Sequence, residues 1–182
     1  MFLNNPFFNY FIVIFVLFIG FVILTALINK NKMNLVFSEI ELFVKEKGYT
    51  FERVKNKPYD VIIKKDQKVY YINLCNIPSN SSVTINSKNT WCLRYGGKRV
   101  GRSYPNKRYM NELIPFLNLK NNNTNNNNSY VKIILLYPST EKVLKYINES
   151  DICEVKPTDL PYGYRVMNYK DFYNYFDMIT TK

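Results

Sequence analysis

The chain has 182 residues, with 25 Lys or Arg against 14 Asp or Glu, so its formal net charge is +11. It contains no histidine, which excludes HExxH zinc sites, Ser-His-Asp triads, Cys-His pairs and histidine-bound metals. Its three cysteines, Cys75, Cys92 and Cys153, are widely spaced and form no CxxC pair, a pattern that indicates free thiols in a reducing compartment. Without an N-terminal anchor, roughly 150 residues remain, enough for one globular domain.

An apolar segment lies near the N-terminus. Residues 11–28 carry no charged side chain and are long enough to cross the hydrocarbon core as a helix. No Lys or Arg precedes the segment, whereas Lys30 and Lys32 follow it, so the positive-inside rule places the N-terminus outside and the domain in the cytoplasm. A cleaved signal peptide is the competing interpretation, but the basic n-region and an A-x-A-like site are missing. We expect a single-pass membrane protein, with residues 1–32 as anchor and basic flank and residues 33–178 as one α/β domain.

The first part of this domain changes from helical to extended patterning. Apolar residues alternate with acids over 33–47, and Gly48 follows, which predicts an amphipathic helix with a glycine cap. Two runs rich in β-branched and aromatic residues, 59–65 and 68–74, flank a two-residue polar turn. They predict a hairpin.

The middle of the domain contains turns and a low-complexity tract. Residues 83–85 and 91–95, a Gly-Gly turn and the segment 98–102 suggest a second hairpin. Helical spacing returns over 106–119. The Asn-rich stretch 121–129 has nothing to bury and is expected to be a disordered, exposed loop.

The C-terminal third contains one strongly apolar strand and several short elements. Residues 130–137 form a near-continuous apolar run, typical of a central strand buried on both faces. Ser139 at the start of 139–148 predicts a capped helix. Segments 152–155 and 165–168 predict short strands, and 169–176 a closing helix. The sum is a mixed α/β domain.

The order of these parts carries a family resemblance. Asp60 opens the first strand of the predicted hairpin, the second strand ends in YYINLCN, Trp91 follows, YPNKR opens a predicted helix and VKIILLY forms a hydrophobic strand. In this order, over residues 33–176, the chain resembles the nuclease-related domain (NERD) family of the PD-(D/E)xK superfamily. The resemblance implies a mixed-sheet, restriction-endonuclease-like domain behind the transmembrane helix.

The departures from the family pattern fall where the chemistry takes place. In a working site of this family, an Asp and a Glu hold a divalent cation, and the Lys of E-x-K helps to activate the attacking water. Residues i and i+2 of a strand face the same site. Here Asn73 and Cys75 occupy the Glu and Lys positions, Arg108 occupies that of the Gln in N-P-x-x-Q, and Asp60 alone remains. The resemblance therefore implies a degenerate, catalytically inactive site with no expected cofactor.

More than one interpretation of these positions stays open. Glu39 or Glu41 can join Asp60 in binding Mg²⁺ or Mn²⁺, with Lys107 or Arg108 in place of the lost Lys, which gives a nuclease with a rearranged site. In a purely structural interpretation, Asp60 is a strand-entry residue paired with a nearby Lys.

The excess positive charge is concentrated before the Asn-rich tract. Residues 30–120 hold 18 Lys or Arg against 7 acids, whereas residues 121–182 hold 7 of each. Residues 88–108 contain no acid and interleave cations with aromatics, which suits phosphate contact and base stacking. The candidate binding residues are Lys88, Trp91, Arg94, Lys98, Arg99, Arg102, Lys107 and Arg108.

Nucleic acid is therefore the leading partner of a membrane-anchored binding module. Trp91 is either a core residue or a stacking platform. The same cations suit docking on anionic lipid headgroups, where each contributes about 1 kcal/mol. The charge pattern is also compatible with a protein-interaction role, or with a solvated face that has no partner.

Overall fold

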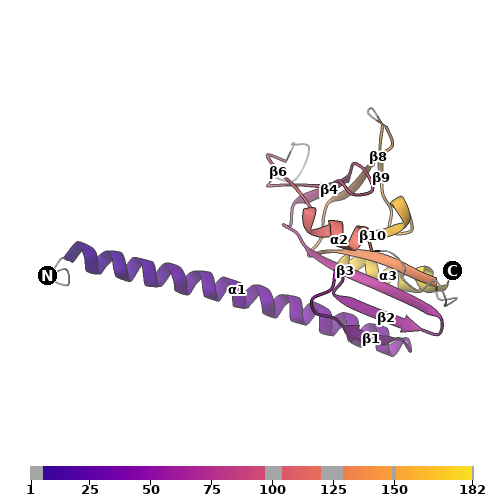
Figure 1. Cartoon of the computed structure of the whole chain (residues 1–182), viewed down its shortest axis with the longest axis horizontal. Helices are drawn as coiled ribbons and strands as arrows, with labels where there is room; N and C mark the ends of the chain where they lie inside the picture. The colour runs from indigo at the N-terminus through magenta and orange to yellow at the C-terminus, as the bar shows by residue number, and fades with distance from the viewer. Residues whose placement is uncertain (1–5, 97–103, 120–128, 149–150, 182) are drawn as a thin grey trace. The chain divides into compact units, whose positions relative to one another are not determined.

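The computed structural model describes residues 6–96, 104–119, 129–148 and 151–181. The chain divides into two compact units, Met1–Glu46 and Lys47–Lys182. Figure 1 draws the first as one long helix and the second as strands with short helices.

The first unit consists of the helix α1 (Pro6–Glu46), 41 residues long. Its apolar side chains between Tyr10 and Ile28 are exposed, and Thr25 turns its hydroxyl back onto the carbonyl of Val22, at 2.8 Å. The mean hydropathy of its most apolar window is 3.2, so α1 is long and apolar enough to cross a membrane. The predicted helices over 11–28 and 33–47 are thus parts of one helix, which ends at Glu46.

The second unit contains two five-stranded mixed sheets, where the sequence suggested one. Sheet A has the order β1-β2-β3-β7-β10 and sheet B the order β6-β5-β4-β8-β9. The strands of sheet A are β1 (Thr50–Arg53), β2 (Val61–Lys65), β3 (Lys68–Asn76), β7 (Ser129–Tyr137) and β10 (Tyr164–Asn168). Those of sheet B are β4 (Ser81–Ile85), β5 (Trp91–Tyr95), β6 (Asn106–Tyr109), β8 (Lys142–Tyr146) and β9 (Ile152–Glu154).

Sheet A contains three neighbouring parallel strands, β3, β7 and β10. β2 and β3 form the predicted hairpin, in which Lys65 pairs with Lys68 across the turn. β7 lies parallel to both β3 and β10, and its residues Ile133 to Leu136 are fully buried. The prediction of a central strand at 130–137 is therefore confirmed, as are the short strands near 152 and 165 and the closing helix, α3 (Tyr169–Thr181).

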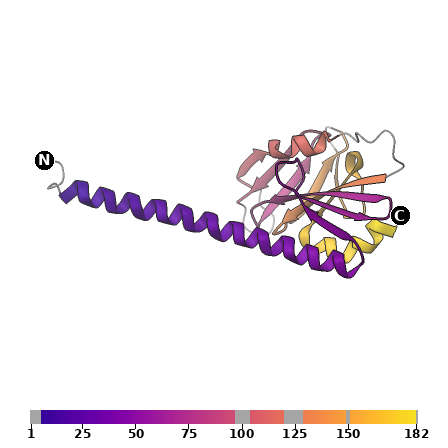
Figure 2. The same ribbon diagram turned by 60° about the horizontal axis from the view of Figure 1, so that its bottom comes forward.

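One hydrophobic core joins the two sheets. It combines Ile134 and Leu136 of sheet A with Val83 and Trp91 of sheet B and with Phe116. Phe116 lies in α2 (Ile114–Leu117), which follows the 3-10 turn η1 (Asn111–Leu113). Figure 2 shows α3 along one side of sheet A, with α2 and sheet B on the other.

The predicted helix over 106–119 is wrong in its first part. β6 instead pairs antiparallel with β5, and Asn106 lies opposite Tyr95. Only the segment after Met110 is helical. Met110, Leu113 and Leu117 have the predicted helical spacing, and all three are buried. The polar residues before them form the edge strand of sheet B, because pairing with β5 outweighs their local conformational preference.

The predicted helix over 139–148 is also wrong. Residues of β8 pair parallel with β4, so that Val83 lies opposite Val143, and antiparallel with β9. Ser139 caps no helix. Instead Thr140 donates its hydroxyl to the carbonyl of Ser81, at 2.6 Å, at the entry to β8. This segment forms a strand instead of a helix because it pairs with the backbone groups at the edge of β4.

Two predictions fall outside the described residues. The strand suggested at 98–102 and most of the Asn-rich loop at 121–129 belong to segments that the structure leaves undescribed. The candidate binding residues Lys98, Arg99 and Arg102 lie there as well. Among the described residues, β5 pairs antiparallel with β4 and with β6.

Candidate functional site

The remaining acid of the predicted site lies where β2 begins beside β3. The backbone N–H of Asp60 donates to the carbonyl of Ile72, at 2.8 Å, and its carboxylate accepts the backbone N–H of Leu74, at 2.7 Å. Asn73 and Cys75 project from β3 on one face, because they are two residues apart. The thiol of Cys75 donates to the side-chain oxygen of Asn73, at 3.1 Å.

Burial changes the pKa values of Asp60 and Cys75. It raises the pKa of Asp60 above its usual value, while the Leu74 N–H and the charge of Arg53 act in the opposite direction. Burial also raises the pKa of Cys75, and the nearby carboxylates of Asp60 and Glu112 raise it further. Cys75 is therefore a neutral thiol at neutral pH, and it supplies neither a cation nor a nucleophile.

The other proposed members of a rearranged site lie on different elements. Glu39 and Glu41 belong to α1, where Glu41 pairs with Lys45 at 2.5 Å. Arg108 of β6 pairs with Glu112 at 2.7 Å. Within residues 6–96, 104–119, 129–148 and 151–181, no group of three or more Cys, Asp or Glu side chains is arranged to hold a metal.

Two exposed cations face each other on β6, the edge strand of sheet B, and its neighbour β5. Arg94 of β5 and Lys107 of β6 are direct cross-strand partners, and both are exposed. The ammonium of Lys107 lies 5.0 Å from the ring centroid of Tyr109. Like charges directly opposite each other destabilise a sheet, so this β5–β6 surface, formed by Arg94, Lys107 and Tyr109, favours an anionic partner.

Trp91 belongs to the core and presents no face to solvent. Its side chain is 1% exposed, and its ring packs edge-on against Tyr164, with centroids 6.4 Å apart. The indole N–H donates to the carbonyl of Lys88, at 3.3 Å. Trp91 therefore holds the turn between β4 and β5 instead of stacking on a ligand.

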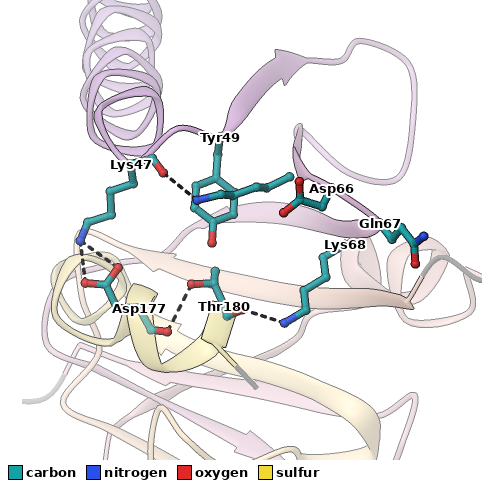
Figure 3. A pocket seen from close by; sticks show the side chains of 8 residues that line it. Lys47, Tyr49, Asp66, Gln67, Lys68, Asp177 and Thr180 are labelled. Carbon is teal, nitrogen blue, oxygen red and sulfur yellow. Dashed lines mark hydrogen bonds and ion pairs between the residues drawn. The ribbon is translucent and has the colours of Figure 1, made fainter.

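A first cavity of about 650 Å³ lies between the β2–β3 turn and α3. Its lysines all have partners: Lys47 binds Asp177 at 2.6 Å, Lys65 donates to the Lys47 carbonyl at 3.2 Å, and Lys68 donates to the Thr180 carbonyl at 2.9 Å. Figure 3 shows the contacts of Lys47 with Asp177 and of Lys68 with Thr180 beside the cavity. It is lined by Lys47, Tyr49, Lys65, Asp66, Gln67, Lys68, Asp177 and Thr180.

A second cavity, of about 640 Å³, is lined by Lys88, Lys132 and the tyrosines 130, 162 and 164. Sequence reasoning assigned no function to Lys132. The signal was available, because Lys132 is the lone charged residue in the apolar run 130–137. In the structure it is 7% exposed.

Comparison with known proteins adds no assignment: no protein-family model, no curated protein and no solved structure matches the chain at a significant level.

Proposed function

We propose that the protein is a membrane-anchored module that binds nucleic acid, on a nuclease-like fold whose catalytic site is degenerate. The observation that carries this proposal is the β5–β6 surface. Arg94 and Lys107 are exposed, directly opposite each other and without a carboxylate partner among the described residues. Tyr109 beside them adds an exposed ring, and the combination suits phosphate contact and base stacking.

The resemblance to the NERD family is supported by the arrangement around Asp60. A helix precedes the β2–β3 hairpin, Asp60 stands at the start of β2, and the E-x-K positions lie on β3. The β6 strand at 106–109 departs from the expected helix start, and it weighs against a close relationship.

The loss of catalysis follows from the chemistry of the group. Mg²⁺ and Mn²⁺ prefer several oxygen ligands, whereas Asp60 is accompanied by an amide and a buried, neutral thiol. Its carboxylate accepts a backbone N–H of its own hairpin. Asp60 then acts as a structural residue that fixes the entry to β2.

The membrane anchor is the other half of the proposal. α1 carries an exposed apolar surface and a span of sufficient length, and the two lysines after its apolar segment favour a cytoplasmic location for the second unit. A protease-accessible tag at the C-terminus tests this topology in intact cells. Protection of the tag supports it, and digestion contradicts it.

The experiment for binding uses the full chain in detergent micelles. Fluorescence anisotropy with labelled single-stranded DNA and RNA, in EDTA and over a salt series, should give salt-dependent binding. Arg94→Ala and Lys107→Ala should weaken it and each reduce the salt slope by about 1. Lys170→Ala, on α3, is the matched charge control and should have no effect.

Three outcomes contradict the proposal. Cleavage in Mn²⁺ that Asp60→Ala abolishes establishes the rearranged nuclease. Binding to anionic vesicles without binding to DNA or RNA establishes a role at the membrane surface. Binding to nucleic acid that neither Arg94→Ala nor Lys107→Ala weakens places the interface elsewhere.

A further inference from the structure

The second cavity combines two cations with aromatic walls. Lys88 comes from the turn between β4 and β5, and Lys132 from the middle of β7. Tyr130, Tyr162 and Tyr164 line the same space, and no acidic side chain among the described residues does. At about 640 Å³, the cavity falls within the range of roughly 300–1,000 Å³ that is usual for small-molecule sites.

Lys132 is buried in β7, and it forms no ion pair with a carboxylate among the described residues. Its ammonium donates to the carbonyl of Leu117, at 3.1 Å, and lies 5.2 Å from the ring centroid of Tyr164. The hydroxyl of Tyr164 donates to the same carbonyl, at 2.9 Å. An ammonium has three N–H groups, so the position of Lys132 is fixed by neutral groups while its charge has no acidic counterpart among the residues described.

Lys88 adds a second charge to the same cavity. It is exposed, and it forms no ion pair with a described residue. Its turn is held by the hydrogen bond from Trp91 to its carbonyl. Burial lowers the pKa of Lys132, and the charge of Lys88 lowers it further. A bound anion relieves both effects, because it neutralises the repulsion and compensates the buried charge.

Tyr162 has an unusual backbone conformation at the rim of this cavity. Its φ and ψ are 54° and 25°, in the left-handed region that bulky residues rarely adopt. Gly163 follows with a φ of 82°, and Lys145 lies 4.7 Å from the Tyr162 ring centroid. Residues held in such conformations cluster at ligand sites.

We propose that this cavity is a nucleotide site, in which Lys88 and Lys132 bind the phosphate and the tyrosine rings contact the base. Two ammonium groups match a phosphate monoester, and aromatic rings match a flat base. A free mononucleotide and the phosphorylated end of a strand share this chemistry. The inference does not rest on the β5–β6 surface, because none of its residues belongs to that surface.

The test titrates AMP, adenosine and inorganic phosphate into the full chain in detergent micelles by calorimetry. Binding of AMP should be tighter than binding of phosphate, and adenosine should bind weakest. Lys88→Ala and Lys132→Met should each weaken AMP about tenfold or more, as expected for the loss of a charged hydrogen bond. The fluorescence of Trp91, the single tryptophan, verifies that each variant is folded.

Two control variants isolate the cavity. Lys68→Met removes a lysine of the first cavity and should leave AMP binding unchanged. Arg94→Ala should weaken long single strands and leave AMP unchanged, so that failure of the nucleotide site and failure of the proposed function are distinguishable. AMP affinity that neither Lys88→Ala nor Lys132→Met reduces, in folded variants, overturns the proposal, as does a wild-type chain that binds neither AMP nor phosphate.

The source of the nucleotide is resolved by competition. A 5′-phosphorylated oligonucleotide that displaces AMP, while its unphosphorylated counterpart does not, establishes a strand end as a ligand. Displacement by free mononucleotides alone establishes a small-molecule site.

Discussion

The two lysine-lined cavities of the second unit differ in how the protein neutralises its own cations. In the first cavity, Lys47 faces Asp177, and Lys65 and Lys68 donate to backbone carbonyls. In the second, Lys88 and Lys132 share one space without an acid among the described residues. A lysine paired with its own counterion can stabilise the folded state. Burying a lysine without a counterion lowers the free energy of unfolding, and such a lysine favours binding of an external anion. The two cavities have nearly the same volume, but the carboxylates of Asp66 and Asp177 line the first, whereas no acidic side chain among the described residues lines the second.

The largest expected effect concerns the wall of the second cavity. Tyr164→Ala removes a ring that is 2% exposed and the hydrogen bond to the Leu117 carbonyl, and should lower the free energy of unfolding by about 3–5 kcal/mol. Tyr49→Ala, at the half-buried wall of the first cavity, should cost less. Urea unfolding of the full chain in micelles, followed by Trp91 fluorescence, measures both. Equal losses of unfolding free energy in the two variants would show that the Tyr164 wall does not contribute more to stability than the Tyr49 wall.

Lys68→Met should destabilise the first cavity. The change removes the bond from the Lys68 ammonium to the Thr180 carbonyl, which anchors the end of α3 to the start of β3. A hydrogen bond from a charged group contributes about 1.5–3 kcal/mol, and partial exposure places the expected loss at the lower end. The same unfolding assay applies. An unchanged midpoint would show that the lysines of the first cavity do not fasten the fold.

Lys132→Met should act in the opposite direction. Because burial and Lys88 lower the pKa of Lys132, the unfolded chain binds more protons than the folded one between the lowered folded value and the unfolded value of about 10.4. Stability therefore rises as pH rises through this window and is lower below it. The variant should be more stable than the wild type at pH 7 and lose this rise. A less stable variant at pH 7 would mean that Lys132 fastens the fold as Lys68 does.

The smallest effect belongs to the exposed pair of the first cavity. Asp177→Asn removes the carboxylate 2.6 Å from the Lys47 ammonium, and surface ion pairs contribute only about 0.2–1 kcal/mol. The loss should shrink further in 0.5 M salt, because mobile ions screen the pair. Unfolding at low and high salt measures it. A large, salt-independent loss would show that the pair acts as a buried one.

Sequence reasoning succeeded where local pattern and tertiary environment agree. β7 is an interior strand between β3 and β10, and the run 130–137 is largely apolar on both faces because the core shared with sheet B covers one face and α3 packs against the other (Figure 2). The β2–β3 hairpin likewise forms from adjacent segments around a two-residue turn. The prediction from sequence failed at 106–109 and 139–148, because the hydrogen-bond partners of these segments are other strands of sheet B.

The sequence by itself determined the apolar N-terminal helix, the absence of histidine chemistry and the concentration of positive charge before residue 121. These depend on composition and on neighbours along the chain. Only the tertiary structure decided that Trp91 is buried, that Arg94 lies opposite Lys107, and that Lys88 and Lys132 share a cavity. Those relations join segments far apart in sequence, and they arise because unpaired strand edges and apolar faces must find partners across the fold.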